Sequence, residues 1–215
     1  LGFKNVYVVP EQELPNGNFP TVDYPNPEDK KAFKLALNLA ERIDADVVLA
    51  TDPDADRIGI AVLDKDDYVF LYGNQTGALL IDYLAKNKKT TKKSILFNTI
   101  VTSSFGSKIA QKYGIETVLT LTGFKFIGEQ AKLLENSNKE FFFGYEESYG
   151  YLASDFVRDK DAIQALLLCC EMACYYKSQG KTLINVLNEL YEEYGYYQEE
   201  LVSINLLGED GNKKI

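Results

Sequence analysis

The hydrophobic pattern of the first part of the chain predicts a small α/β unit. An apolar run at 6–9, stopped by Pro10, predicts a strand, and the residues after it predict a long irregular loop. Asn26 and Pro27, followed by two acids, are typical of a helix start, and apolar residues recur at helical spacing from 33 to 43. This unit therefore opens with a strand, a loop and an amphipathic helix.

Two further apolar segments complete the unit. The continuous apolar run at 47–50 predicts a strand buried on both faces. The segments 58–63 and 68–71 flank a charged turn at 64–67, which predicts a hairpin.

The pattern then becomes an alternation of strands and helices, as in α/β domains with a parallel sheet. Helices are expected at 77–85, 106–113, 126–134, 161–176 and 183–194, and strands at 94–98, 117–121, 140–143 and 201–206. The predicted fold is α/β, with two consecutive α/β units whose mixed or mostly parallel sheets are flanked by helices. We expect the units at 1–70 and 71–196, followed by a linker at 197–215 toward a further domain.

Composition narrows the chemistry. Of 215 residues, 46% are hydrophobic and 26% charged, which is ordinary for a globular protein. The absence of histidine excludes Ser-His-Asp and Cys-His catalysis and His-ligated zinc. A net charge of -9 does not favour binding to nucleic acid, which needs a basic surface. With no apolar run long enough to span a membrane and no signal peptide, the sequence predicts a soluble, cytoplasmic protein with reduced cysteines at 169, 170 and 174.

The strongest motif is DPDADR at 52–57, directly after the predicted strand at 47–50. Residues two apart in an extended loop point the same way, so Asp52, Asp54 and Asp56 can converge on one point. Three carboxylates repel one another without a cation, and their number favours Mg²⁺. Arg57 can hold a phosphate on the same ion. A solvated acidic turn is the alternative.

Two known motifs share this spacing. An EF-hand loop would need glycine at Arg57 and glutamate at Leu63, and is excluded. A phosphoaspartate phosphatase would use Asp52 as nucleophile and Asp54 as acid and base, although Asp56 stands where that family usually has Thr or Val. This second reading stays open.

Three further segments can bind anions or hydroxyls. The run LTGFKF places Thr122, Gly123 and Lys125 at a helix start, although a plain strand-to-helix turn explains it too. In FGYEESYG, Glu146 and Ser148 can bind vicinal hydroxyls of a sugar, or lie in a polar loop. The segment RDKD can bind phosphate or assist proton transfer through Arg158 and Lys160, or simply begin a helix.

Together, in this order, the four segments resemble the α-D-phosphohexomutases, which include phosphoglucomutases and phosphomannomutases. TDPDADR resembles the metal-binding loop of that family, GYEESYG its sugar-recognition loop, TGFK a loop between the two, and VRDKDA a segment with a functional lysine. The family has four domains, and this chain resembles the later part of the second, all of the third and the linker to the fourth.

The resemblance implies roles for individual residues. It makes Asp52, Asp54 and Asp56 the Mg²⁺ ligands, and Arg57 and Lys160 catalytic residues, with Arg57 beside a phosphoserine. Sugar phosphates would bind at Thr122, Gly123, Lys125, Glu146, Ser148 and Arg158.

The resemblance also implies a reaction, in which glucose 1-phosphate and glucose 6-phosphate interconvert through a phosphoserine, with glucose 1,6-bisphosphate as intermediate and activator. The chain has no Ser-His-Asn-Pro loop and no phosphate loop of the fourth domain. We therefore expect an inner fragment that lacks an N-terminal phosphoserine domain and a C-terminal phosphate-binding domain, and that is inactive alone. A phosphomannomutase, a phosphopentomutase and a non-catalytic module that binds metal and sugar phosphate remain alternatives.

Overall fold

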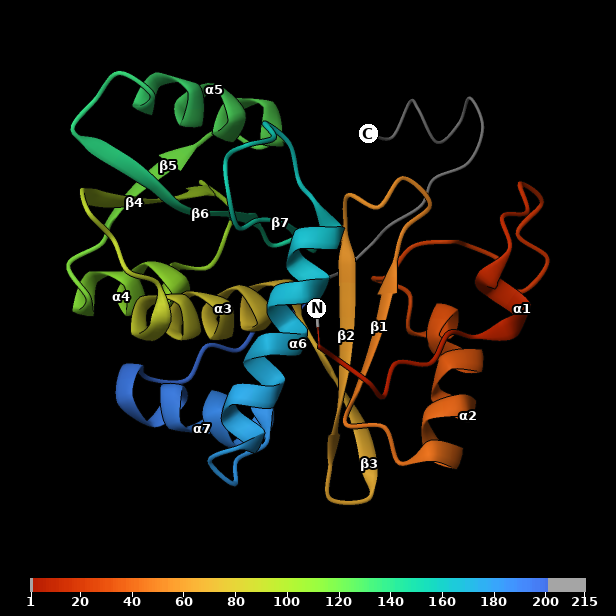
Figure 1. Ribbon diagram of the computed structural model, residues 1–215. Helices are drawn as coiled ribbons and strands as arrows, with labels where there is room; N and C mark the ends of the chain where they lie inside the picture. The colour runs from red at the N-terminus through yellow and green to blue at the C-terminus, as the bar shows by residue number, and fades with distance from the viewer. Residues whose placement is uncertain (1, 201–215) are drawn as a thin grey trace.

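The structure, a computed structural model, describes residues 2–200 and contains two β-sheets with helices around them (Figure 1). The first sheet has the order β1-β2-β3 and is antiparallel throughout. Its unit consists of α1 (Pro10–Glu13), the 3-10 helix η1 (Lys30–Phe33), α2 (Lys34–Ile43), β1 (Val47–Thr51), β2 (Ile58–Asp64) and β3 (Asp67–Leu71).

The second sheet has the order β5-β4-β6-β7, with β4, β5 and β6 parallel and β7 antiparallel to β6. In Figure 1, α5 lies on one side of this sheet, and α3 and α4 lie on the other. The strands are β4 (Lys93–Thr99), β5 (Glu116–Thr120), β6 (Lys139–Glu146) and β7 (Gly150–Leu152). The helices are α3 (Gly73–Asn87), α4 (Ser104–Lys112), α5 (Phe124–Leu134), α6 (Ala162–Lys177) and α7 (Leu183–Tyr194).

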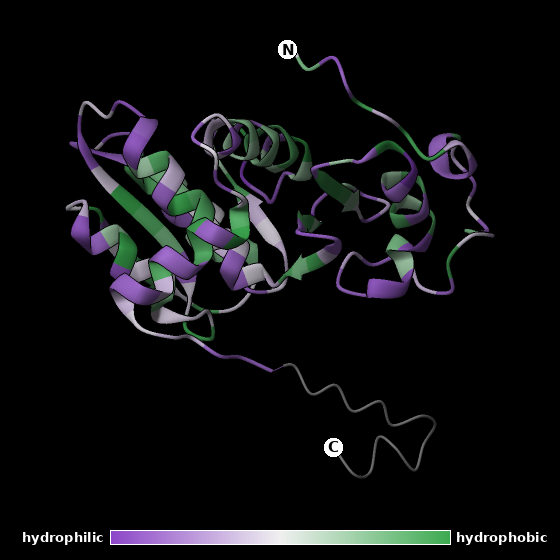
Figure 2. Ribbon diagram, turned by 90° about the horizontal axis from the view of Figure 1, so that it is seen from below, coloured by the Kyte–Doolittle hydropathy of each residue, from purple (hydrophilic) through white to green (hydrophobic). Residues whose placement is uncertain are grey.

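The alternation of side chains along β2 lets one strand serve two cores. Ala61 faces a small core with Phe33 and α2, whereas Ile60 and Val62 face the main core, which continues into the second unit. Both α6 and α7 contact β2, and α6 also contacts α3. In Figure 2 the strands of the second sheet are largely green, and the helices around them turn purple sides to the solvent. The two units thus share the main hydrophobic core, which fixes their relative position.

Main-chain hydrogen bonds also join the units around the loop at 52–57. The backbone N–H of Ile58 donates to the carbonyl of Tyr149 at 3.1 Å, and that of Ala162 donates to the carbonyl of Ala55 at 2.9 Å. Arg57 and Gly150 form an isolated antiparallel bridge. The loop is therefore held between the turn from β6 to β7 and the start of α6.

The α/β class with two consecutive units is confirmed, and several local expectations need correction. The strand predicted at 6–9 is wrong: among residues 2–200 no strand pairs with this segment, and Val6 and Val8 are 68% and 57% exposed. Strand β1 is not buried on both faces, because it lies at an edge of the sheet and only Val48 in it is buried.

The helix expected from Asn26 begins later. The Asp29 side chain caps η1 by accepting from the N–H of Lys31, and α2 follows from Lys34. Strand β7 was not predicted, and the strand predicted at 201–206 lies outside the described residues. Within residues 2–200, no helix is both long enough and apolar enough to cross a membrane.

Candidate functional site

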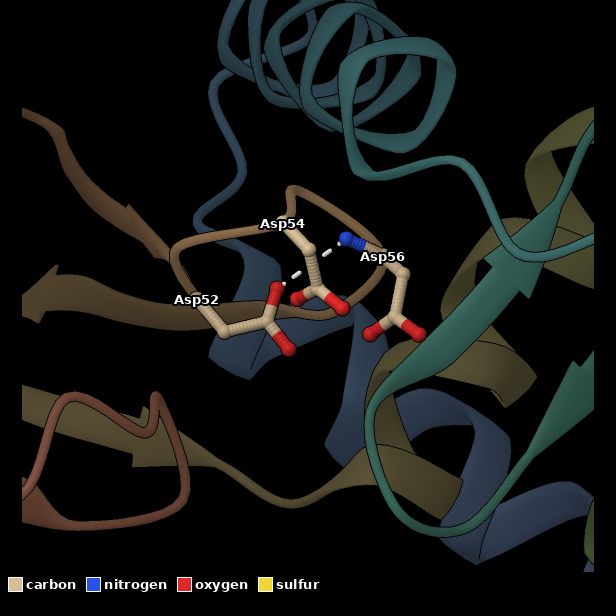
Figure 3. A group of neighbouring side chains, drawn as sticks. All are labelled: Asp52, Asp54 and Asp56. Atoms are coloured by element: carbon tan, nitrogen blue, oxygen red, sulfur yellow. Dashed lines mark hydrogen bonds between the residues drawn. The ribbon is translucent and has the colours of Figure 1, made fainter.

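The acidic loop between β1 and β2 folds so that its three aspartates face one another (Figure 3). Asp52 Oδ1 accepts hydrogen bonds from the backbone N–H groups of Asp56 at 3.0 Å and Arg57 at 2.9 Å. Ala55 adopts a φ of 55°, and this left-handed residue makes the tight turn that returns the chain to β2. One carboxylate oxygen from each of Asp52, Asp54 and Asp56 lies within 4.8 Å of the others.

This acidic cluster (Asp52, Asp54 and Asp56) suits a hard divalent cation. Its donors are carboxylate oxygens, which Mg²⁺ prefers, and three of them leave positions for water or a phosphate. Partial burial and the neighbouring carboxylates raise the pKa of Asp52, although the N–H of Arg57 opposes that rise. A bound cation would relieve the repulsion that raises this pKa, so the residues present fit the ion that the sequence predicts.

Two basic side chains approach the acidic cluster. Lys160 Nζ lies 2.5 Å from Asp56 Oδ2. Arg57 Nε lies farther away, 3.8 Å from Asp52 Oδ2 and 3.7 Å from Asp56 Oδ1. Burial alone would raise the pKa of Asp56, but the hydrogen bonds with Lys160 and Asp52 and the charges of Lys160 and Arg57 together outweigh burial, and the pKa is lowered. Burial would likewise lower the pKa of Lys160, whereas Asp56 raises it, so Lys160 stays protonated.

The predicted sugar-recognition segment forms the end of β6, a turn and β7. Glu146 is 8% exposed, and its Oε1 accepts a hydrogen bond from the backbone N–H of Gly123 at 2.8 Å. Burial raises the pKa of Glu146, and the bond from Gly123 offsets only part of that rise. Gly123 has a φ of 107°, a conformation that favours glycine. Two segments predicted separately from the sequence are therefore in direct contact.

The remaining predicted residues lie around this centre. Ser148 is half-buried in the turn between β6 and β7. Thr122 and Lys125 flank the Gly123 turn and are exposed. Arg158 pairs with Glu135 at the end of α5, and its Nε donates to the carbonyl of Asp155 at 3.2 Å.

Arg158 is nevertheless close to the acidic cluster. With Asp54, Lys160 and their neighbours it lines a shallow hollow of about 550 Å³. Within residues 2–200, no ion pair or hydrogen bond joins Thr122, Lys125 or Arg158 to the acidic cluster.

Sequence reasoning missed Glu28. Its Oε1 accepts a hydrogen bond from Arg57 Nη1 at 3.0 Å, across 29 residues of chain, and no local pattern indicates this pairing. It also gave no separate role to Glu147, which accepts hydrogen bonds from the hydroxyl of Thr102 at 2.9 Å and that of Thr99 at 3.4 Å. The consecutive residues Glu146 and Glu147 thus bind different partners, the backbone of Gly123 and the hydroxyls of Thr99 and Thr102.

Comparison with known proteins shows that the segments around the acidic cluster match two domains of one protein family. The family model described as phosphoglucomutase/phosphomannomutase, alpha/beta/alpha domain III, matches residues 72–194, and the model for domain II of the same family matches residues 1–65. The chain belongs to the phosphoglucomutase/phosphomannomutase family. The acidic cluster falls in the part that matches domain II, and Gly123, Glu146 and Lys160 fall in the part that matches domain III.

Curated members of the phosphoglucomutase/phosphomannomutase family match along the whole chain. The phosphoglucomutase of Staphylococcus epidermidis is 40% identical over 216 residues, which cover 100% of this chain and 39% of the relative. That of Staphylococcus haemolyticus is 38% identical over the same shares. The chain thus spans about two fifths of the length of these relatives.

Solved structures of the phosphoglucomutase/phosphomannomutase family share the fold. The parafusin phosphoglucomutase of Paramecium superposes with a TM-score of 0.64 at 23% identity, over 80% of this chain and 30% of that one. A family protein of Burkholderia thailandensis superposes with a TM-score of 0.62 at 18% identity, over 81% of this chain and 35% of that one.

Proposed function

We propose that this chain supplies the metal-binding and sugar-recognition parts of a phosphoglucomutase that interconverts glucose 1-phosphate and glucose 6-phosphate. The observation that carries the proposal is the convergence of Asp52, Asp54 and Asp56 beside Lys160 and Arg57, in a chain of this family. The names of the curated relatives favour glucose over mannose or pentose phosphates. The reaction would pass through a phosphoserine and glucose 1,6-bisphosphate.

In this proposal the acidic cluster holds Mg²⁺. When bound, the ion stabilises negative charge on a transferring phosphoryl group. Arg57 binds oxygens of the phosphoserine phosphate, because its planar guanidinium matches phosphate geometry. Lys160 keeps its proton at Nζ, because Asp56 raises the pKa of that amine. In this protonated form Lys160 can contact the phosphate or donate a proton to it.

The sugar would bind at the turn between β6 and β7. One carboxylate oxygen of Glu146 is occupied by the N–H of Gly123, so the other is available to accept from a sugar hydroxyl. The hydroxyl of Ser148 can donate or accept beside it. Thr122, Lys125 and Arg158 would complete the contacts with the phosphate and the sugar.

The nucleophilic serine and the outer phosphate site would come from domains that this chain lacks, an N-terminal phosphoserine domain and a C-terminal phosphate-binding domain. The 39% of the curated relatives that the chain covers supports this part of the proposal. We therefore expect the chain alone to show no mutase turnover.

A chimera tests this proposal. The chain replaces the matching segment of the Staphylococcus epidermidis phosphoglucomutase, and glucose 6-phosphate formation is followed in a coupled dehydrogenase assay. We expect turnover by the chimera and none by the chain alone or by the chimera with Asp54→Asn. Turnover only with mannose or pentose phosphates would change the substrate assignment. A folded chimera that binds Mg²⁺ and sugar phosphate without any turnover would favour the non-catalytic binding module.

A further inference from the structure

Glu28 is held in a fixed position beside the acidic loop. The side chain of Asn26 accepts from the N–H of Glu28 at 2.8 Å, and the carbonyl of Asn26 accepts from the N–H of Asp29 at 3.0 Å. The backbone next to it lies directly on β2 at Gly59, where a Cβ atom would come within 2.6 Å of the Pro27 carbonyl oxygen. Both the turn and this close approach set where the Glu28 carboxylate lies.

The guanidinium of Arg57 lies between two sets of carboxylates. Nη1 is 3.0 Å from Glu28, which is hydrogen-bonding distance. Nε is 3.7 and 3.8 Å from oxygens of Asp56 and Asp52, which is too long for a hydrogen bond. The three aspartates carry more negative charge than Glu28 alone, so a freed guanidinium would be attracted into the acidic cluster.

We propose that Glu28 is a positioning residue, which holds the Arg57 guanidinium back from Asp52 Oδ2 and Asp56 Oδ1 and so leaves these two oxygens free for a divalent cation. The other oxygen of Asp56 pairs with Lys160, and the other oxygen of Asp52 accepts backbone hydrogen bonds. The inference deepens the proposed function, because it rests on the metal site assigned there. A guanidinium paired with Asp52 and Asp56 would occupy the oxygens that the cation needs, and would compete with it. Glu28 would thus influence metal affinity without contacting the metal.

The test measures Mg²⁺ affinity by calorimetry in four proteins: the parent chain, Glu28→Gln, Arg57→Gln and the double variant. We expect Glu28→Gln to weaken Mg²⁺ binding about threefold to tenfold, the range of a partly exposed charged pair. In the Arg57→Gln background the same change should have no effect, because no guanidinium remains to compete. The exposed Glu41→Gln changes net charge equally and should leave the affinity unaltered.

Other outcomes overturn the proposal. An equal loss of Mg²⁺ affinity with and without Arg57 would mean that Glu28 acts through its charge or through folding. No loss of affinity in either background would mean that Arg57 stays away from the acidic cluster without Glu28. A crystal structure of metal-free Glu28→Gln gives a readout that is independent of Mg²⁺. We expect the Arg57 guanidinium within hydrogen-bonding distance of Asp52 or Asp56; an unmoved guanidinium contradicts the proposal. If the parent chain binds no Mg²⁺, the metal site assigned in the proposed function is wrong. The crystal structure of the Glu28→Gln variant then decides by itself whether Glu28 positions Arg57.

Discussion

Glu146 and Glu147 are adjacent carboxylates for which we predict opposite effects on stability. Glu146 is buried and accepts one hydrogen bond, from the N–H of Gly123. Glutamine is nearly isosteric and can keep that bond, so Glu146→Gln removes the cost of burying a charge. Because one bond compensates only part of that cost, we expect a gain of about 1 kcal/mol in the free energy of unfolding at pH 7.

The neighbouring residue is the matched control. Glu147 accepts from the hydroxyls of Thr102 and Thr99. Hydrogen bonds to a charged acceptor are stronger than those to a neutral one, so Glu147→Gln should lose about 1 kcal/mol. Both variants remove one negative charge, and any general effect of net charge cancels between them.

The pH dependence gives a second check. The folded-state pKa of Glu146 is raised above its usual value of 4.5, so in the pH range between the two values the folded state binds more protons than the unfolded state. The ionised group therefore lowers stability above its folded pKa, and this cost disappears below pH 4.5. Urea unfolding of both variants and the parent between pH 4 and 8 should show the gain of Glu146→Gln vanishing at the acid end. A Glu146→Gln protein that is less stable than the parent at pH 7 would refute the reasoning.

Two further substitutions probe the shared core and the loop contact. Asp82 accepts hydrogen bonds from Tyr176 at 2.7 Å, Lys86 at 2.6 Å and Tyr113 at 3.0 Å. Asp82→Asn should therefore lower the free energy of unfolding in urea by about 3 kcal/mol, whereas Asp66→Asn at an exposed position should change it little. Equal effects of the two substitutions would contradict a stabilising role of Asp82 in the core. Gly59→Ala would place its Cβ 2.6 Å from the Pro27 carbonyl oxygen and should lower the free energy of unfolding by about 2 kcal/mol in the same measurement. An unchanged stability would show that the backbone at Pro27 moves away without cost.

Sequence periodicity located the elements whose signals are local. Helix α7 has the predicted bounds because its apolar residues recur at helical spacing and Thr182 caps it by accepting from the N–H of Asn185. The hairpin of β2 and β3 follows from two apolar runs around a charged turn. The convergence of the DPDADR aspartates was predicted from side-chain alternation in an extended segment. The structure has a tight turn there instead, in which the N–H of Ala55 donates to the carbonyl of Asp52 at 3.1 Å and Ala55 has a φ of 55°, so the aspartates meet for a different reason.

What the sequence could not predict depends on distant contacts. An apolar run forms a strand only beside a partner, and the described residues offer none to 6–9. Strand β7 has three residues, too few for a periodic signal, and it exists because it pairs with β6. The bond between Gly123 and Glu146 and the pairing of Glu28 with Arg57 join segments 23 and 29 residues apart.

The most direct test of the central claim, that the acidic cluster is a metal site, is a calorimetric titration of this chain with Mg²⁺. We predict one saturable site whose affinity falls at least about tenfold in Asp54→Asn, because an exposed ligand charge is lost without disturbing the fold. Asp66→Asn, with the same change of net charge in the turn between β2 and β3, should bind as the parent does. Equal affinities in all three proteins, or no binding by the parent chain, would contradict the claim.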